Sequence, residues 1–281
     1  MPSNGYGAVN GNGSGRAAGA GAGAGAHGDE EQPLLGQARP HKRAWRTNMT
    51  TDVSRDWADM MLLVCYVITG LLDTAAISTW GSFVSMQTGN TVYFGLGLAA
   101  PYESTRWIKS GTSLACFCLG SVFFSYFHRH FSPKKRWVLC ASFIIQLVFI
   151  VIAASLFTFG TRSTNPKESI GWPDMVPIAL IAFQSAGQAV TSRALKYNAL
   201  TSVVLTSIYC DLFSDAKLLV ADNPERNRRV GAPLLLLIGA VTGGLLSHSS
   251  VGSASALWVA AALKLVVILA WFFWPAEKDE A

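Results

Sequence analysis

A run of polar residues interrupts one of the long apolar segments of the sequence, residues 83–100. The run consists of Gln87, Thr88, Gly89, Asn90 and Thr91. Amide and hydroxyl groups are costly where a chain faces lipid, because no water is present to satisfy them. We therefore expect these side chains to satisfy backbone groups freed by a helix break, to bind a solute in a cavity, or to do both. Gly89, with Gly95 and Gly97, is expected to loosen the helix.

Two charged side chains lie deep inside predicted membrane spans. Asp73 lies well within residues 58–80, and Lys264 lies near the middle of residues 254–274. A charge at that depth is costly unless it is neutralised, paired or hydrated. We expect both to be coupling groups for a proton or cation, and the alternative for Asp73 is a protonated cap on the broken backbone. Lys264 is expected to line a cavity paired with an acid such as Asp73 or Asp211, or else to be deprotonated.

Polar residues of the second half provide matching candidates for the binding site. Gln184 and Gln188 are one helical turn apart, and Gln188 falls near the position that matches Asp73 when a three-residue gap is allowed. Ser202 and Thr206 follow in a Thr- and Ser-rich segment. We expect Gln188, Ser202 and Thr206 to join the run at 87–91 in binding a solute. Hydrogen bonding of the two amides between helices is the alternative.

The composition indicates an integral membrane protein. Of 281 residues, 51% are hydrophobic and 14% are charged, against about 25% charged in soluble domains. The net charge of +5 is spread between the apolar segments, where basic residues set membrane orientation, so we expect no nucleic-acid partner. The predicted environment is the lipid bilayer. The predicted fold class is all-α, a polytopic α-helical membrane protein.

Six of the apolar segments are long and apolar enough to span a bilayer. These six are residues 58–80, 108–127, 137–160, 175–195, 231–248 and 254–274, and the two polar, interrupted segments are 83–100 and 200–220. If the interrupted segments only dip into the membrane, the basic loop 128–136 lies on the same side as the basic flank 45–57. Six spans therefore satisfy the positive-inside rule better than eight spans, with the N-terminus in the cytoplasm.

The two halves of the predicted membrane domain (58–275), residues 58–160 and 175–275, look like copies of one unit. Thr206 follows Thr88 by 118 positions, and the same shift places Gln146 on Lys264. With three full spans in each half, the second copy is inverted relative to the first. Inverted repeats of this kind are common in secondary transporters, where interrupted helices of the two halves meet near the midplane.

The N-terminal residues 1–44 are rich in Gly, Ala and Ser and are predicted to be a disordered cytoplasmic tail. Within this tail, Glu30 precedes Leu34 and Leu35 with the spacing of an acidic dileucine sorting signal. Such a pair fits the hydrophobic pocket of a sorting adaptor, and a chance occurrence is the alternative. Residues 276–281 are predicted to form a cytoplasmic C-terminal tail.

The sequence contains no recognisable catalytic or metal-binding motif. The five cysteines and five histidines lack the spacing of a metal site, and neither a G-x-S-x-G elbow nor an HExxH motif is present. We therefore expect no enzyme activity, no metal and no cofactor.

A stretch of 31 residues, TGLLDTAAISTWGSFVSMQTGNTVYFGLGLA at 69–99, resembles the signature of the DUF1275 family, the YoaK-like integral membrane proteins of bacteria and fungi. The likeness rests on a small-residue helix with an internal acid (Gly70, Asp73), followed by F-V-S-x-x-T-G-N-T. Residues 185–207 are similar to the family's second motif, with Ser in place of Gly after its last Thr. The resemblance covers about residues 55–275 and suggests a fungal-type member. It implies an architecture but no substrate.

These features favour a secondary transporter of a small solute or ion, with a midplane site at the interrupted segments. The alternative is a non-transporting scaffold or assembly protein, in which the polar breaks only shape the fold. The solute, the coupling ion and the direction are left open. The dileucine sequence favours a vacuolar or endosomal membrane, and the plasma membrane is the alternative.

Overall fold

The computed structural model describes residues 48–54, 57–160, 165–197, 200–220 and 222–277. The chain divides into residues 1–40 and residues 41–281, and every described residue belongs to the second unit. The predicted N-terminal tail lies outside the described residues, as do the sorting signal at Glu30, Leu34 and Leu35 and the last four residues of the C-terminal tail.

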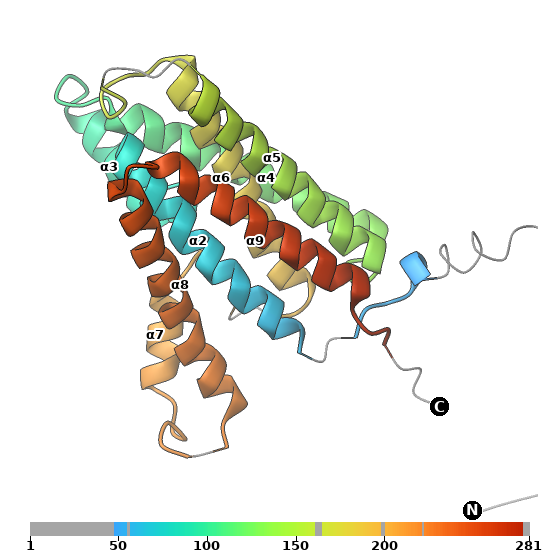
Figure 1. The fold of residues 1–281 in the computed structure, drawn as a ribbon. Coiled ribbons are helices and arrows are strands. Elements are labelled where there is room, and N and C mark those ends of the chain that lie inside the picture. The colour runs from blue at the N-terminus through green and yellow to red at the C-terminus, as the bar shows by residue number, and fades with distance from the viewer. Residues whose placement is uncertain (1–47, 55–56, 161–164, 198–199, 221, 278–281) are drawn as a thin grey trace, which may run out of the picture. The chain divides into compact units, whose positions relative to one another are not determined.

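The described residues form an all-helical protein, as the sequence predicts (Figure 1). The helices are α2 (Ala58–Trp80), α3 (Gln87–Ala99), α4 (Arg106–Phe131), α5 (Arg136–Phe159), α6 (Trp172–Ala194), α7 (Thr206–Phe213), α8 (Pro224–His248) and α9 (Ser253–Phe273). Six of them, all except the short α3 and α7, are long and apolar enough to cross a membrane. The prediction of six spans and two interrupted segments in an integral membrane protein is confirmed.

Two spans are longer than their apolar patterns predict. α8 begins at Pro224 rather than at residue 231, because Asn223 caps it by accepting a hydrogen bond from the Arg226 N–H (3.0 Å) and proline suits the first helical position. α4 continues to Phe131 through the basic residues 128–130. Cations are favourable in the last turn of a helix, so the charges that end the apolar pattern do not end the helix.

One end of the helix bundle, here called the basic end, brings together the starts of α2, α5 and α8 with the ends of α4, α6 and α9. The contacts that join them are Val53 N to Lys134 O (2.9 Å), Ser54 N to Pro275 O (3.0 Å), Arg228 Nε to Asp59 Oδ2 (2.5 Å) and His128 Nε2 to Thr191 Oγ1 (3.2 Å). The α4–α5 connection therefore lies at the same end as the start of α2. This placement is the one that six spans require.

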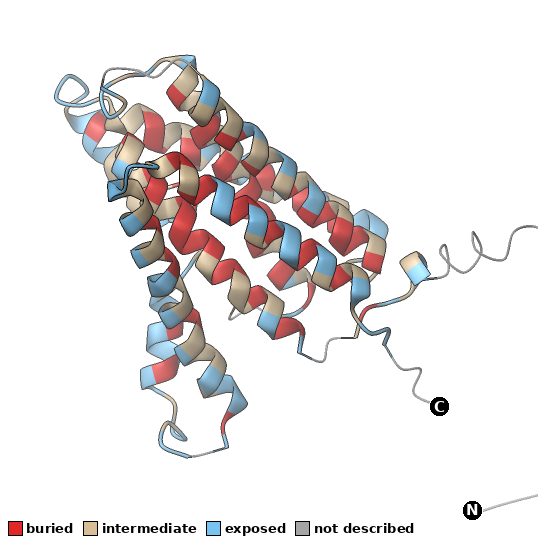
Figure 2. Cartoon of the chain, in the orientation of Figure 1, coloured by how far each residue is buried: buried red, intermediate tan, exposed pale blue. Residues whose placement is uncertain are grey.

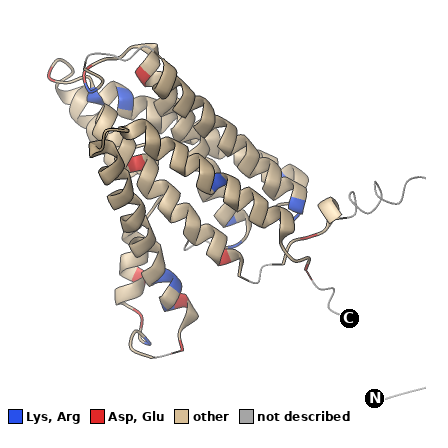
Figure 3. Cartoon of the chain, viewed as in Figure 1, with Lys and Arg blue, Asp and Glu red and all other residues tan. Residues whose placement is uncertain are grey.

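The opposite end joins the remaining helix termini. The contacts there are Trp80 Nε1 to Asp174 Oδ1 (3.2 Å), Thr105 Oγ1 to Glu168 O (2.8 Å) and Trp258 Nε1 to Thr158 Oγ1 (3.1 Å). Successive long helices thus alternate in direction through the bundle. Charged residues gather near the helix ends, and few lie within the spans (Figure 3).

The six spans differ in how deeply they are buried (Figure 2). In the most apolar 18 residues of each span, the buried share is 61% in α2 and 67% in α6, 50% in α5 and 44% in α9, and 22% in α4 and 17% in α8. α2 packs on α8 and α9, α6 packs on α4 and α5, and α5 packs on α9. This set of pairs is unchanged when α2, α4 and α5 are exchanged with α6, α8 and α9.

Candidate functional site

The first interrupted segment is a helix break at residues 81–86, which join α2 to α3. Asp73 of α2 accepts hydrogen bonds at Oδ1 from the backbone N–H groups of Val84 and Ser85 (both 2.9 Å), and Ser85 Oγ donates to Oδ2. Backbone N–H groups at a helix start lack partners in the helix, and a carboxylate can satisfy them. The contacts of Asp73 are therefore those of a cap on the broken backbone.

Asn90 holds the same break from the other side. Its Oδ1 accepts from Ser82 Oγ (3.0 Å) and Phe83 N (3.1 Å), and its Nδ2 lies within hydrogen-bond distance of Phe83 O (2.8 Å), Ser113 Oγ (3.0 Å) and Gln87 Oε1 (3.1 Å). The residue is fully buried. Because the donors and acceptors of this amide already have protein partners, the contacts of Asn90 are those of a residue that positions the break.

The break lies before the polar run rather than within it. α3 continues without interruption through Gly89, Gly95 and Gly97, so the expectation that these glycines loosen the helix is wrong. A Cβ on Gly97 would overlap the Trp107 side chain of α4, and one on Gly89 would come within 3.0 Å of the Phe83 ring. These two glycines instead allow α3 to pack closely on its neighbours.

The second interrupted segment has its break between α6 and α7, at the described residues 195–197 and 200–205, here called the second break. An amide side chain holds this break in place. Ser202 is buried with a φ of 60°, and its Oγ accepts a hydrogen bond from Gln188 Nε2 of α6 (3.1 Å). The same Nε2 lies 3.1 Å from Thr69 Oγ1 of α2. Gln188 and Ser202, both predicted from the sequence, are therefore in direct contact. Thr206 is the exposed first residue of α7.

Lys264 is fully buried in α9 and contacts amides rather than acids. Its Nζ donates to Gln146 Oε1 of α5 (2.9 Å) and to Gln188 Oε1 of α6. The ion pairs found among the described residues do not include Lys264, so the expected pairing with Asp73 or Asp211 is replaced by two amide oxygens. Amide oxygens accept hydrogen bonds from an ammonium group but leave its charge uncompensated.

The hydrogen bonds continue from Lys264 to His128 of α4. Gln146 Nε2 donates to Ser142 Oγ (3.3 Å), and His128 Nε2 lies 3.2 Å from both Ser142 Oγ and Thr191 Oγ1. All of these side chains are buried. A continuous buried polar network, here called the Lys264 network, thus joins α2, α4, α5, α6, α9 and the second break.

His128 also lines a cavity of about 490 Å³ between α3, α4, α6 and the second break. The cavity is lined from the first half by Ser85, Gln87 and Thr88, and from the second break by Val203 and Val204. Residues of both interrupted segments therefore meet at one cavity, beside one end of the Lys264 network.

Not every predicted site residue reaches this cavity. Gln87 and Thr88 line it, and Gln188, Ser202 and Lys264 belong to the adjacent network. Thr91 is exposed, and its hydroxyl donates to the Gln87 carbonyl (2.8 Å). Thr91, Asn90 and Thr206 are not among the lining residues.

The contribution of α4 to the cavity was missed in the sequence. Ser121, Ser125 and His128 follow one another at spacings of four and three, which places them on one face of a helix. A polar stripe on a largely apolar span is the signal that would have found them.

The region that contains both breaks, the cavity and the Lys264 network matches one family model, described as "Protein of unknown function (DUF1275)", over residues 61–270. The chain belongs to the DUF1275 family. A search of the curated proteins and a search of the solved structures give no match. The narrower likeness to YoaK-like, fungal-type members of DUF1275 stays a prediction.

Proposed function

We propose that the protein is a secondary transporter of a small solute or ion, with its binding site in the cavity between α3, α4, α6 and the second break. The observation that carries this proposal is the meeting of both interrupted segments at one cavity. Broken helices that converge from two halves of a membrane protein are the usual way to build a transport site. Backbone outside a helix is tolerated at membrane depth where protein or a water-filled cavity satisfies it.

An inverted two-fold repeat underlies this proposal. The most buried spans, α2 and α6, are a matched pair under the repeat, as are the least buried spans, α4 and α8. Members of each matched pair run in opposite directions between the two ends of the bundle. Gln146 and Lys264, which the 118-residue shift makes equivalent, are hydrogen-bonded to each other where α5 packs on α9. Residues on a two-fold axis contact their own equivalents, so this bond supports an axis between α5 and α9.

In alternating access, the cavity would open toward one end of the bundle and then toward the other. Arg129 and Arg193, both exposed at the basic end, line the cavity. At the opposite end, the bond from Trp80 to Asp174 and that from Lys109 Nζ to the Pro166 carbonyl join spans and connections. We assign the described conformation to a state open toward the basic end, and these polar contacts to the closed gate.

Lys264 is the better of the two predicted coupling residues. Asp73 is occupied with the backbone of the first break, whereas Lys264 lacks a carboxylate partner among the described residues and sits at the centre of a network that touches the second break. A change in the charge of Lys264 would alter its bonds to Gln146 and Gln188, and through Gln188 the hold on Ser202.

The basic end is proposed to face the cytoplasm, because basic residues accumulate on that side of membrane proteins. The vacuolar or endosomal membrane, with a sorting adaptor bound at the dileucine sequence, remains part of the proposal, and the plasma membrane is the alternative.

The test is flux through liposomes that contain the purified full-length chain, with organic anions, organic cations, sugars and alkali ions offered in turn. We expect one solute class to cross faster than in empty liposomes. Thr88→Trp, which places a large ring in the cavity, should reduce the initial rate about tenfold or more. Thr91→Trp is the matched control, because Thr91 is exposed on the same helix but does not line the cavity.

Two results would contradict the proposal. One is a correctly folded chain that carries no solute of any class. The other is a flux that Thr88→Trp and Thr91→Trp leave equally unchanged. Either result would favour the scaffold alternative.

A further inference from the structure

We infer that the cavity binds a small organic anion, a carboxylate with a short apolar body, which enters from the basic end. Binding of the anion is inferred from the cavity itself, whereas its transport rests on the proposed function.

The charged side chains among the described residues that line the cavity are two arginines. Arg129 of α4 and Arg193 of α6 line it where it approaches the basic end, and His128 lines it deeper, with 2% of its surface exposed. Aspartate and glutamate are absent from the described residues that line it. An arginine guanidinium can bind a carboxylate through two parallel hydrogen bonds, so two such groups favour an anion over a cation.

Four acids of the basic end are paired with cations outside the cavity. The ion pairs among the described residues join Lys134 to Glu277, Arg228 to Asp59, and Arg229 to Asp215 and Glu225. Neither Arg129 nor Arg193 takes part in any of them. Both arginines also lie in the last turns of their helices, where a cation is favourable in any case. Their position at helix ends explains why two arginines occur here. It does not explain why the described residues that line the cavity include no acid.

His128 supplies an independent observation. Its Nε2 faces Ser142 and Thr191, whereas its buried Nδ1 has no hydrogen-bond partner among the described residues. A buried polar atom without a partner calls for a specific explanation, such as an ion or a water bound beside it. Nδ1 of a histidine whose Nε2 accepts carries the proton and can donate to a carboxylate oxygen.

The remaining walls suit the apolar body of such an anion. Phe117, Val190, Val203 and Val204 line the cavity together with small hydroxyl-bearing residues of α4. Its volume of about 490 Å³ lies within the range of about 300–1,000 Å³ for small-molecule sites. A bare inorganic ion would leave these apolar walls without a partner.

The test compares three ligands of nearly one shape and different charge, namely benzoate, benzamide and benzylammonium. Binding to the purified full-length chain is measured at pH 7 by calorimetric titration. We expect benzoate to bind and the other two to bind at least about tenfold more weakly. Arg129→Gln combined with Arg193→Gln should weaken benzoate binding about tenfold or more. Lys134→Gln is the control, because Lys134 lies at the same end outside the cavity.

Equal binding of the three ligands, or unchanged benzoate binding in the double variant, would overturn the inference. If the double variant does not fold, Arg193→Gln alone serves, since Arg193 is exposed. If the protein carries a cation or a sugar, and benzoate neither inhibits this flux nor is carried itself, the proposal of an organic anion is wrong. The proposal of a transporter would still hold. Benzoate binding without flux of any solute would support the site and contradict transport.

Discussion

Asp73, predicted as a coupling group, and Asn90, predicted to contact a solute, hold one segment of backbone from two sides. Asp73 satisfies N–H groups at Val84 and Ser85, and Asn90 binds both the N–H and the carbonyl of Phe83. Unpaired backbone groups at membrane depth are costly, so these side chains are needed wherever the helix is broken. These two polar residues around the first break are therefore explained by the backbone groups that they satisfy, without a role in solute binding.

The Asp73 contacts predict a graded effect of substitution. Asp73→Ala leaves two backbone donors without their acceptor and should lower the free energy of unfolding by about 1–3 kcal/mol. Asp73→Asn retains one oxygen acceptor and should cost less. Thermal unfolding in detergent measures both variants. An equal loss in the two would contradict a capping role and restore the case for a coupling charge.

Asn90 offers a second test with a neighbour as its control. Asn90→Ala removes a buried amide and leaves several polar partners unsatisfied, so we expect a loss of about 1–3 kcal/mol or more. Thr91→Ala removes an exposed hydroxyl from the same helix and should change stability by less than about 0.5 kcal/mol. Similar unfolding temperatures for the two variants would mean that Asn90 is not the residue that holds the break.

Helix contacts depend on glycines at particular places rather than on glycine content. A Cβ at Gly239 of α8 would overlap the backbone of α2 at Val67, whereas a Cβ at Gly244 would meet only the Thr74 methyl group, at 3.9 Å. Close approach of two backbones through small residues is the usual basis of helix packing in membranes. An added side chain at Gly239 should therefore disturb the α2–α8 contact, whereas one at Gly244 should not.

Gly239→Ala should destabilise the protein by about 1–3 kcal/mol, because the added methyl group forces α2 and α8 apart. Gly244→Ala should be neutral or stabilising, since alanine is the better helix former by about 1 kcal/mol. Unfolding of the two variants in the same detergent gives the comparison. Equal destabilisation would show that helix contact is not the cause.

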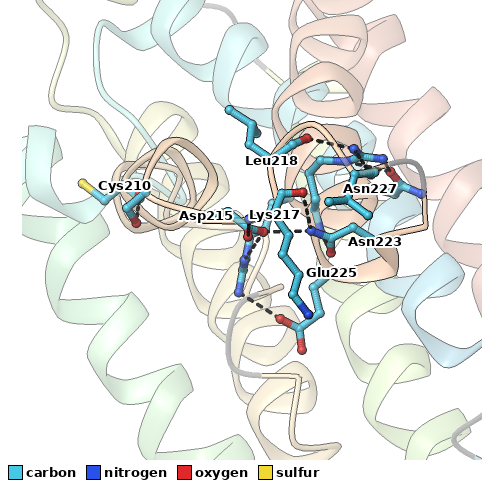
Figure 4. A network of polar contacts seen from close by, with 11 residues as sticks. Cys210, Asp215, Lys217, Leu218, Asn223, Glu225 and Asn227 are labelled. Atoms are coloured by element: carbon cyan, nitrogen blue, oxygen red, sulfur yellow. Dashed lines mark hydrogen bonds and ion pairs between the residues drawn. The ribbon is translucent and has the colours of Figure 1, made fainter.

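The connection from α7 to α8 is organised around Asp215 (Figure 4). The carboxylate accepts hydrogen bonds from the Lys217 N–H (2.8 Å) and Asn223 Nδ2 (3.1 Å), and Arg229 lies 3.4 Å away. The pKa of Asp215 lies below its ordinary value. The largest cause is the hydrogen bond from the Lys217 N–H, followed by the hydrogen bond from Asn223 and the positive charge of Arg229. This connection fixes the start of α8 at the basic end.

A lowered pKa in the folded state makes the stability of this connection depend on pH. Its contribution is fully present above the ordinary aspartate pKa of about 3.9 and is lost as the pH falls through the lower folded value. The protection of residues 214–220 against hydrogen exchange, relative to the intrinsic exchange rate at each pH, should therefore fall below about pH 4. Asp215→Asn should remove this pH dependence. A variant that keeps the same loss of protection would contradict the assignment.

Orientation is a property of the whole molecule, because it requires all six spans to alternate. With the exposed Cys118 and Cys210 replaced by serine, Ser132→Cys should react with an impermeant thiol reagent from the side that bears the N-terminal flank. Lys167→Cys should react from the opposite side only. Labelling of sealed vesicles of known orientation separates the two. Reaction of both from one side would contradict the six-span arrangement.

The sequence by itself indicated a membrane environment, favoured six spans over eight and located the two interrupted segments. Long apolar runs and basic connections are local properties of the chain, and the bilayer acts on them directly. The sequence also identified Gln188, Ser202 and Lys264 as polar groups in apolar surroundings. Such groups are rare enough in spans to be recognised without a structure.

Only the tertiary structure decided what those groups contact. Asp73 accepts hydrogen bonds from backbone N–H groups, and Lys264 donates to two amide oxygens and not to an acid. His128 lines the cavity and also belongs to the Lys264 network. The partners of Lys264 and His128 come from other helices, and those of Asp73 come from the break that follows α2. Their positions therefore depend on how the helices pack. Hydropathy records how apolar each helix is, but the direction in which a polar side chain points is set by which helix lies opposite.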